Sequence, residues 1–499
     1  MISILNLTKT NKLILAAATF LAVLAVGSGR AHAATITVGS GCTIENAIVS
    51  VNSTTSQASC SASGAYGTDD TINIPAGTHT LTGSLTHIQE NVTINGAGMG
   101  STTIDADGNN SGFIADSVDV TFSNLKITAY TGLGAIETNE SNVNLENVEV
   151  DGQGSDAQTA IYVRNDANTI KTVTGNNIYI HDINIPGSGG NSQIHIFAVE
   201  QRGGGTTNAT FQNITIADIY NADGGVNGFM MTVGVFGTLG GNGTLNATMN
   251  NVTIDNVGSV GITAPFSSVS FAAGGDSNVN TTVNNATITG TRGITGSVPP
   301  LTGVKSAAFY AATAGITSGD VGNAHVSVSN SLLADNQSGG DSSNCMAADF
   351  TTGFSGGGSG DPTITSLGHN ISDDASCTTF TGSGDQQNVS SIISTLGLLR
   401  SNGGNVPTRA LLSGSPAISA GGAVLGVTTD ARGVSRPSTC PSVGAFQFEG
   451  AVCAASTTNA GTNAGAPNTG IHSVSLIGVS IATLLGLSVI GYSITTKRN

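Results

Sequence analysis

The stretch Val143-Asn-Leu-Glu-Asn147-Val-Glu-Val150 places apolar residues at alternate positions on both sides of a single asparagine. Such alternation predicts a β-strand with one buried face. The asparagine interrupts the alternation, and Asn adopts left-handed backbone more readily than other side chains. We therefore interpret the stretch as a strand, a bend and a second strand.

The same pattern recurs down most of the chain, with 23 to 45 residues between copies and no helical pattern between them. This spacing indicates one supersecondary unit stacked on itself. We predict an all-β, right-handed parallel β-helix with coils about 4.8 Å apart and a hydrogen-bonded ladder of bend asparagines. The shortest interval predicts a bare coil, and the longer ones predict inserted loops. The predicted ladder residues are Asn91, Asn124, Asn147, Asn177, Asn213, Asn251, Asn285 and Asn330.

The composition agrees with a β-solenoid. The chain of 499 residues has 69 Gly, no Trp and 9% charged residues, and tight turns need Gly while an α/β enzyme carries more Lys, Glu and Arg. Between residues 34 and 469 there are ten basic and thirty-one acidic residues, a net charge of −21. That charge repels phosphate backbones, so we predict no nucleic-acid partner.

Residues 1–33 have the features of a signal peptide. Lys9 and Lys12 form a basic start, residues 13–26 an apolar core, and Ala31-His-Ala33 a small-x-small cleavage signal. The residues of the predicted cleavage site are Ala31, Ala33 and Ala34. Cleavage after Ala33 would leave a mature chain that begins at Ala34. A retained membrane helix is the alternative, but the apolar run is short for it.

Six cysteines fall into three pairs that are close in sequence, which in an exported chain favours disulfides. Fifteen connectivities are possible for six cysteines, and proximity favours one of them. Zinc would need a clustered spacing that is absent. The predicted pairs are Cys42 with Cys60, Cys345 with Cys377, and Cys440 with Cys453.

A short amphipathic helix is predicted after Thr43, its candidate N-cap, because apolar residues follow at helical spacing. Within residues 34–68 it would close the open end of the solenoid. Cys42-Thr-Ile-Glu-Asn-Ala47 and the strands after it resemble bacterial surface β-helix proteins named for a Cys-Ser-Leu-Arg-Glu-Ala motif. The segment keeps the Cys and the Ala of that motif and differs at its Arg and Glu.

The sequence style changes at Cys345, after coils predicted for residues 69–344. An ordered series of four motifs follows: Ser366-Leu-Gly-His-Asn-Ile-Ser-Asp-Asp374, residues 403–421 beginning Gly403-Gly-Asn-Val-Pro-Thr-Arg409, Thr429-Asp-Ala-Arg-Gly-Val-Ser-Arg-Pro437, and Pro441-Ser-Val-Gly-Ala-Phe446. It resembles the C-terminal region of bacterial choice-of-anchor proteins. The resemblance implies that residues 345–453 form the end of a right-handed β-helix on a surface protein, and it implies no activity.

The extreme C-terminus resembles a sortase sorting signal. A polar spacer (454–465) precedes the pentapeptide, an apolar run (474–494) suited to a transmembrane helix follows it, and a basic tail (495–499) ends the chain. The resemblance implies cleavage between Thr and Gly and transfer to an envelope amine. Leu is usual at the first position, so the alternative is an uncleaved membrane anchor. The implied recognition residues are Ala466, Pro467, Asn468, Thr469 and Gly470.

Parallel β-helices also carry polysaccharide-active enzymes, so an enzyme is the alternative function. A glycoside hydrolase needs two carboxylates about 5 to 9.5 Å apart. The doublets Asp69–Asp70 and Asp373–Asp374 are adjacent on their strands and point to opposite faces. The candidate lyase bases are scattered in the sequence, and we predict no catalytic residue. These bases are Lys126, Arg164, Lys171 and Arg202.

We likewise predict no metal or cofactor. The segment from Asp105 to Asp116 spaces oxygen ligands as in an EF-hand loop, but Asn110 stands where Gly is required and Asp116 replaces the bidentate Glu. A polar turn is favoured there over calcium. His369 has no nucleophile beside it, and His181-Asp182 is favoured as a strand end over a catalytic dyad.

We expect an exported, acidic β-helix on the cell surface, wall- or membrane-anchored through its C-terminus, that acts as a non-catalytic adhesin or envelope structural protein. The alternative is a surface lyase or glycoside hydrolase on the same scaffold. The expected partners are a sortase for processing, an envelope glycan or neighbouring-cell surface, and the membrane through the C-terminal helix.

Overall fold

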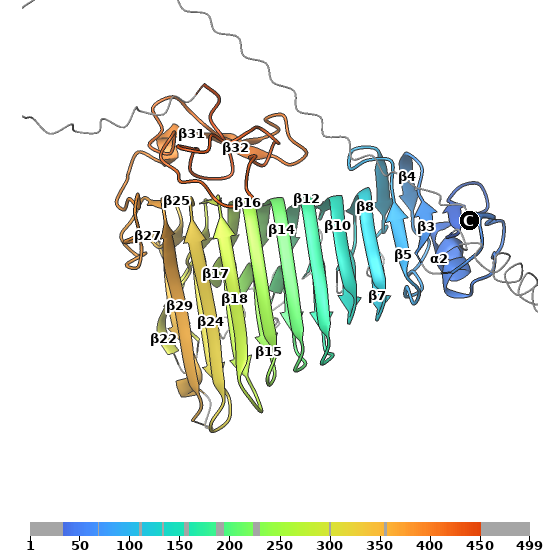
Figure 1. Ribbon diagram of the computed structural model, residues 1–499, viewed down its shortest axis with the longest axis horizontal. Helices are drawn as coiled ribbons and strands as arrows, with labels where there is room; N and C mark the ends of the chain where they lie inside the picture. Colours follow the sequence, from blue (N-terminus) through green and yellow to red (C-terminus); the bar gives the residue numbers. More distant parts are fainter. Residues whose placement is uncertain are drawn as a thin grey trace, which may run out of the picture. The chain divides into compact units, whose positions relative to one another are not determined.

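Each coil of the chain pairs its strands in parallel with those of the next coil. A computed structural model describes residues 33–450 apart from 68, 109–111, 132–133, 154–158, 186–193, 223–229, 299–300 and 354–356. In it, β10 (Asn142–Asp151) pairs in parallel with β8 (Asp119–Thr128) before it and β12 (Ile170–Ile185) after it. Figure 1 shows the strands of successive coils lying side by side, stacked along one axis. The predicted parallel β-helix is confirmed.

One sheet of eight parallel strands, here called the far sheet, is separate from the sheet that contains the bend asparagines. It contains β7 (Phe113–Asp116), β9 (Ile136–Asn139), β11 (Ile161–Asn165), β13 (Ile194–Gln201), β15 (Met230–Leu239), β17 (Ile262–Ala272), β23 (Phe309–Gly315) and β28 (Cys345–Asp349).

The other large sheet folds around the bends. Besides β8, β10 and β12 it contains β1 (Thr35–Thr37), β2 (Ala62–Ser63), β3 (Asp70–Asn73), β4 (Gly77–Thr80), β5 (Val92–Asn95), β6 (Thr102–Asp105), β14 (Thr206–Asn221), β16 (Thr244–Ser259), β18 (Ser277–Asn284), β19 (Thr287–Thr289), β20 (Arg292–Gly293), β24 (Val321–Ser329), β25 (Leu332–Ala334), β26 (Gln337–Ser338), β27 (Asp341–Ser342), β29 (Ser359–Gly368) and β30 (Ile371–Ser372). Two antiparallel hairpins stand apart, β21 (Thr295–Val298) with β22 (Leu301–Lys305) and β31 (Leu396–Arg400) with β32 (Thr408–Leu411).

The bend asparagines have left-handed backbone and bond to one another. Asn147 has a φ of 54°, and its amide donates to Asn124 Oδ1 at 2.9 Å and accepts from Asn177 Nδ2 at 2.9 Å. Asn124, Asn177, Asn213, Asn251, Asn285 and Asn330 also have positive φ. The backbone therefore turns at each of these residues, and the Asn147 amide joins its coil to both neighbours, whereas Asn213 donates to Asn176 and not to Asn177.

The ladder departs from the prediction at its two ends. Asn91 is not a bend residue: it precedes β5, and its Oδ1 accepts the N–H of Asp119 at 2.8 Å, while Asn95 bonds to Asn124 in the ladder. Asn285 has the bend conformation, but neither of its amide atoms has a hydrogen-bond partner among the described residues, and it lines a cavity of about 120 Å³. Asn330 bonds out of the ladder to Gly422.

In most coils a second bend follows the bend asparagine by five residues. The sequence analysis did not predict this second bend. Its residues also have positive φ: Ala129, Asp182, Asp218, Asn256, Gly290 and Asp335. His369 takes the position of the bend asparagine in the last coil, with a φ of 58°. It therefore has a structural role, as expected from the sequence.

Alternation along the strands fills the core. Val143, Leu145, Val148 and Val150 are at most 3% exposed, and phenylalanines of successive coils contact one another with ring centroids 5.0 to 6.2 Å apart. We expected the longer intervals between bend asparagines to carry inserted loops only. They also lengthen the strands, from 10 residues in β8 and β10 to 16 in β12, β14 and β16.

The N-terminal end is closed by the predicted helix, α2 (Ile44–Asn52), whose N-cap Thr43 accepts the Asn46 N–H at 3.1 Å. Disulfides join Cys42 to Cys60 and Cys345 to Cys377, as predicted. Cys440 is also disulfide-bonded, and its predicted partner Cys453 lies outside the described residues.

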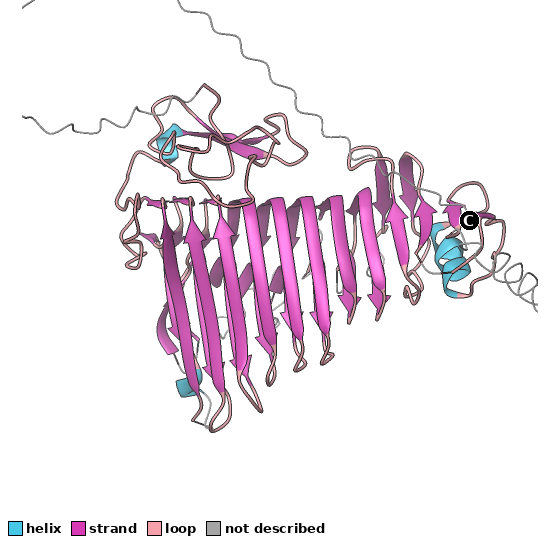
Figure 2. Ribbon diagram, viewed as in Figure 1, coloured by secondary structure: helices cyan, strands magenta, loops and turns pink. Residues whose placement is uncertain are grey.

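The parallel strands continue past residue 344, through β28 and β29, to β30. The chain then leaves the coils, and residues 373–450, here called the C-terminal cover, fold back along the bends as loops and the β31–β32 hairpin (Figures 1 and 2). Asn405 Nδ2 donates to Asn147 Oδ1 at 3.0 Å, and Thr215 Oγ1 donates to the Pro407 carbonyl at 2.7 Å. The cover therefore packs across coils far from it in sequence.

The cover is fixed to the bends by residues of the ordered C-terminal series. The Arg436 guanidinium donates to Asn251 Oδ1 at 3.0 Å and to the Gly444 carbonyl at 2.7 Å, and burial lowers the pKa of Arg436 to about 10. The Asp430 carboxylate pairs with Arg432 at 2.8 Å. These residues therefore have a structural role.

The predicted targeting segments lie largely outside the described residues. Ala31 and the rest of residues 1–32, the spacer, the sorting motif 466–470 and the predicted helix 474–494 belong to that part. Among the described residues, no helix is both long and apolar enough to span a membrane.

Replacing Asn147 by Ala is expected to destabilise the protein by about 3 kcal/mol, because Ala resists positive φ by about 1 to 2 kcal/mol and the amide hydrogen bonds are lost at about 1 kcal/mol each. Asn147→Gly keeps the backbone and loses only the hydrogen bonds, so it should cost clearly less. Urea unfolding of both variants checks this order. Equal losses would show that the left-handed bend is not the constraint.

Candidate functional site

Four charged side chains converge just after the first bend, and we call them the charged cluster: Lys126, Glu149, Asp151 and His181. Lys126 Nζ lies 3.1 Å from Glu149 and 2.5 Å from Asp151, and His181 Nε2 lies 3.1 Å from Glu149 Oε1. His181 Nδ1 also lies 2.7 Å from Asp182 Oδ2. The cluster is assembled by register, because Lys126 pairs with Glu149 across β8 and β10, and Asp151 with His181 across β10 and β12.

Opposite charges outweigh burial in this cluster. Burial by itself would raise the pKa of Glu149 and Asp151, but hydrogen bonds from His181 and Lys126 and their charges lower both values. Burial would lower the pKa of Lys126 and His181, but the carboxylates raise both. The opposite charges thus favour the charged form of each group.

This arrangement suits an ion-pair network better than catalysis. A general acid at neutral pH needs a raised carboxyl pKa, and a lysine base needs a lowered one. The cluster shows the opposite in both cases. The ligand atoms of Glu149, Asp151 and His181 lie within 4.8 Å of one another, a spacing that a cation could use, but the Lys126 ammonium already sits against the two carboxylates.

The Asp373–Asp374 doublet is used structurally, whereas Asp69 of the other doublet is exposed. Asp373 accepts the Asp335 N–H at 2.7 Å, and Asp374 accepts the Asn344 amide at 3.0 Å. Burial raises the pKa of Asp373. In the loop weighed for calcium, Asp116 lies 2.7 Å from His87 Nδ1, and residues 109–111 are outside the described part.

Two of the other candidate bases, Arg164 and Arg202, are in ion pairs at the far sheet, whereas Lys171 lies in β12 and has no ion pair among the described residues. Arg202 lies 2.8 Å from Glu200, and its guanidinium donates to the Tyr162 hydroxyl at 2.6 Å. Tyr162 in turn donates to Glu200 at 2.7 Å. Arg164 pairs with Asp166 at 3.0 Å. Both ion pairs therefore join residues two apart in sequence, whereas Tyr162 reaches Glu200 and Arg202 from the neighbouring strand β11.

A second candidate site is the outer surface of the strands before the first bend, which we call the polar face. Its two rows of outward side chains are partly or fully exposed, while the residues between them are buried. Neither row contains Lys, Arg or an aromatic ring other than His. One row is Asp119, Asn142, Thr172, Asn208, Asn246, Asn280, His325 and Thr363, and the other is Thr121, Asn144, Thr174, Thr210, Thr248, Thr282, Ser327 and Thr365.

Side-chain hydrogen bonds along the solenoid axis hold much of the polar face. Asn280 Nδ2 donates to Asn246 Oδ1 at 3.1 Å, and Asn246 Nδ2 donates to Asn208 Oδ1 at 3.1 Å. Their rotamers are therefore fixed before any ligand arrives.

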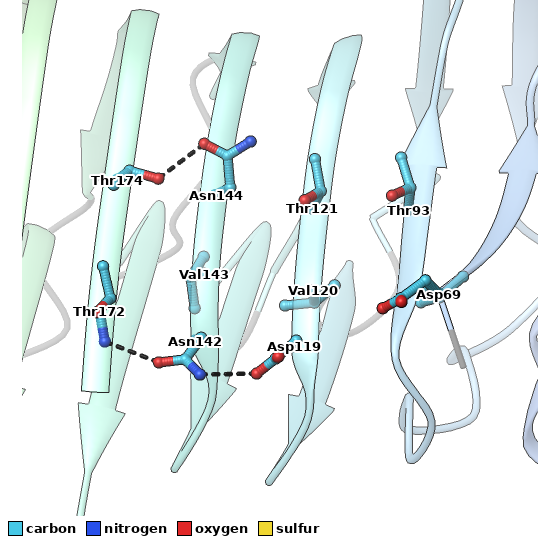
Figure 3. A pocket seen from close by; sticks show the side chains of 11 residues that line it. Asp69, Thr93, Asp119, Val120, Thr121, Asn142, Val143, Asn144, Thr172 and Thr174 are labelled. Atoms are coloured by element: carbon cyan, nitrogen blue, oxygen red, sulfur yellow. Dashed lines mark hydrogen bonds between the residues drawn. The ribbon is translucent and has the colours of Figure 1, made fainter. Parts of the chain in front are cut away.

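The early coils of the polar face form a shallow groove of about 230 Å³. Figure 3 shows Thr174 donating to Asn144, and Asn142 bonded to Asp119, in line across the strands. The hydroxyls and amides point outward in repeated order. The groove therefore offers donors and acceptors, together with the carboxylates of Asp69 and Asp119, to a bound molecule.

Comparison with known proteins gives one structural likeness and no family. No family model matches the chain, and no curated protein matches it. Among solved structures, the chain is similar to the crystal structure of pectate lyase Pel9A at 14% sequence identity and a TM-score of 0.34, over 76% of this chain and 88% of that chain.

The charged cluster has a signature in the sequence, in the positions of its residues relative to the bend asparagines. Lys126, Glu149 and Tyr179 each stand two residues after a bend asparagine, and Asp151 and His181 each stand four residues after one. Aligning the copies on their asparagines would have placed them together.

The charged cluster predicts a pH-dependent stability. Because the folded pKa of His181 is raised above its ordinary 6.5, its contribution is fully present below pH 6.5 and is lost as the pH rises through the folded value. His181→Gln should therefore cost about 2 kcal/mol near pH 5.5, where the carboxylates are still ionised, and less near pH 8.5. Thermal unfolding at both pH values checks this.

His79→Gln is the matched control, because the His79 ring lies 2.9 Å from the Pro75 carbonyl oxygen and has no ion pair among those described. Its cost near pH 5.5 should be clearly smaller than that of His181→Gln, because it removes no ion pair among those described. A His181→Gln penalty that is constant with pH would contradict the ion-pair interpretation.

Proposed function

We propose that the protein is an exported, cell-surface β-helix that acts without catalysis and binds a neutral glycan on its polar face. The observation that carries the proposal is the two rows of hydroxyl and amide side chains. Sugar hydroxyls both donate and accept hydrogen bonds, as Thr and Asn do. The two disulfides support an extracellular location, where disulfides form and persist.

The charge of the molecule favours a neutral ligand over an acidic one. The predicted ectodomain is strongly acidic, and the rows contain no cationic side chain to pair with a uronate or a phosphate. No Phe, Tyr or Trp stands in the rows to stack on a sugar ring, so affinity would come from hydrogen bonds. Each such bond contributes only about 1 kcal/mol, so a useful site needs many of them.

The geometry suits a repeating ligand. Successive coils present the same kinds of group about 4.8 Å apart, and groups two residues apart on one strand lie about 7 Å apart. A linear glycan lying along the axis would meet an equivalent set of groups at each coil. Weak contacts would then add as multivalent binding.

A polysaccharide-active enzyme remains the alternative because the charged cluster brings carboxylates and a lysine together. The pKa directions in that cluster favour ion pairing over acid–base chemistry. Release of new sugar ends by the purified protein would support the enzyme instead.

Thr210→Val with Thr248→Val should weaken binding to a linear neutral glycan about tenfold, because two hydroxyls are removed from exposed strand positions that Val fits well. Immobilised neutral glucan, mannan and N-acetylglucosamine polymers, with polygalacturonate as the acidic comparison, provide the assay. Affinity is measured at two salt concentrations, because binding by hydrogen bonds should depend little on salt.

Thr379→Val with Thr381→Val is the control, because both residues are exposed on the C-terminal cover. This variant should bind as the unchanged protein does. Binding only to polygalacturonate, or equal binding by both double variants, would overturn the proposal for the polar face.

The proposed anchoring depends on Ala466-Pro-Asn-Thr-Gly470 and its resemblance to a sortase signal. If a transpeptidase cleaves after Thr469, Thr469→Val should remove most of the protein from the covalently linked envelope fraction. Detergent extraction of cell envelopes followed by mass analysis of the C-terminal peptide measures this. Unchanged covalent linkage would exclude the sortase and leave the membrane helix as the anchor.

A further inference from the structure

Asp70 is a fully buried carboxylate at the start of β3. Its exposed fraction is 0%, and its Oδ1 accepts the backbone N–H of Ala34 at 2.7 Å. The other hydrogen bond recorded for it comes from the Gly67 N–H at 3.4 Å. Among the residues that the structure describes, no Lys, Arg or His forms an ion pair with it.

A buried carboxylate without a cation is costly, because removal from water is not repaid by an opposite charge. The shorter of its two hydrogen bonds among the described residues comes from the Ala34 nitrogen, which belongs to the first residue after the small-x-small cleavage signal. Ala34 is itself 0% exposed, and its carbonyl accepts the Thr71 N–H at 2.8 Å. Ala33 is only partly buried.

We propose that export processing after Ala33 creates the missing cation. Hydrolysis of the Ala33–Ala34 peptide bond consumes one water, leaves a carboxylate on Ala33 and releases an α-amino group on Ala34. That group is protonated at neutral pH, since its ordinary pKa is about 7.7 to 8.0. The Ala34 α-ammonium then forms a buried ion pair with the Asp70 carboxylate.

The pair would couple maturation to folding of the N-terminal cap. β1 pairs with β3 in parallel and with β2 in antiparallel, so Ala34 enters the sheet directly beside Asp70. In the unprocessed chain Asp70 receives a neutral amide N–H, and after cleavage it receives a charged donor that bonds roughly twice as strongly. The cap would thus be fully stable only after the signal peptide is removed. This inference does not depend on what the polar face binds.

The test compares the exported, processed protein with a variant that carries Gly-Ser inserted between Ala33 and Ala34. The insertion keeps the cleavage signal but moves the new α-ammonium two residues away from Asp70. Both proteins are treated with an amine-acylating reagent under native conditions, and the N-terminal peptide is analysed by mass. We expect the processed chain to begin at Ala34 and its α-amine to react at least tenfold more slowly than that of the insertion variant.

Asp70→Asn tests the partner, with Asp69→Asn as the control on the exposed neighbour. Asp70→Asn should restore fast acylation of the α-amine and lower the hydrogen-exchange protection of the peptide containing Thr71, and combining it with the insertion should add little further loss. Asp69→Asn should change neither. A processed chain that begins elsewhere, or an Ala34 α-amine that reacts as fast as that of the insertion variant, would overturn the proposal.

Discussion

The structure depends on a side chain that can hold left-handed backbone and also bond to its own copy one coil away. Asn does both: Asn147 turns its corner at a φ of 54° and its amide bonds to Asn124 and Asn177. A coil spacing of about 4.8 Å brings equivalent amides within hydrogen-bond reach. Gly would permit the bend but could not satisfy the neighbouring amide, so the two demands together select Asn.

The C-terminal cover packs on the same row of bend asparagines. Later in the chain the ladder receives partners from the cover: Asn251 donates to the Thr429 carbonyl and accepts from Arg436, and Asn330 bonds to Gly422. The surface after the first bend is therefore occupied along the later coils, and there Asp255 pairs with Arg409 at 3.1 Å. The polar face, before the bend, stays open to solvent.

The fold could be predicted from the sequence because its information is local. Alternation and one asparagine within eight residues specify strand, bend and strand, and repetition specifies stacking. The site could not be predicted in the same way. Lys126 and Asp151 meet through register across coils, and Thr215 meets Pro407 across 192 residues, so no local pattern contains either contact. The prediction for Asn91 was wrong because Val92 and Ile94 repeat the apolar spacing that follows the true bends, although the residues before Asn91 do not.

The two candidate sites differ in what is left for a ligand. In the charged cluster, the Lys126 and His181 cations already pair with Glu149 and Asp151, so a ligand must break ion pairs before it can bind. On the polar face, Asn208, Asn246 and Asn280 bond to one another, and those bonds fix their geometry while their remaining donor and acceptor sites still face outward. A preorganised surface loses little side-chain entropy on binding. The same neighbour-to-neighbour bonding that closes the coils therefore prepares the open face for recognition.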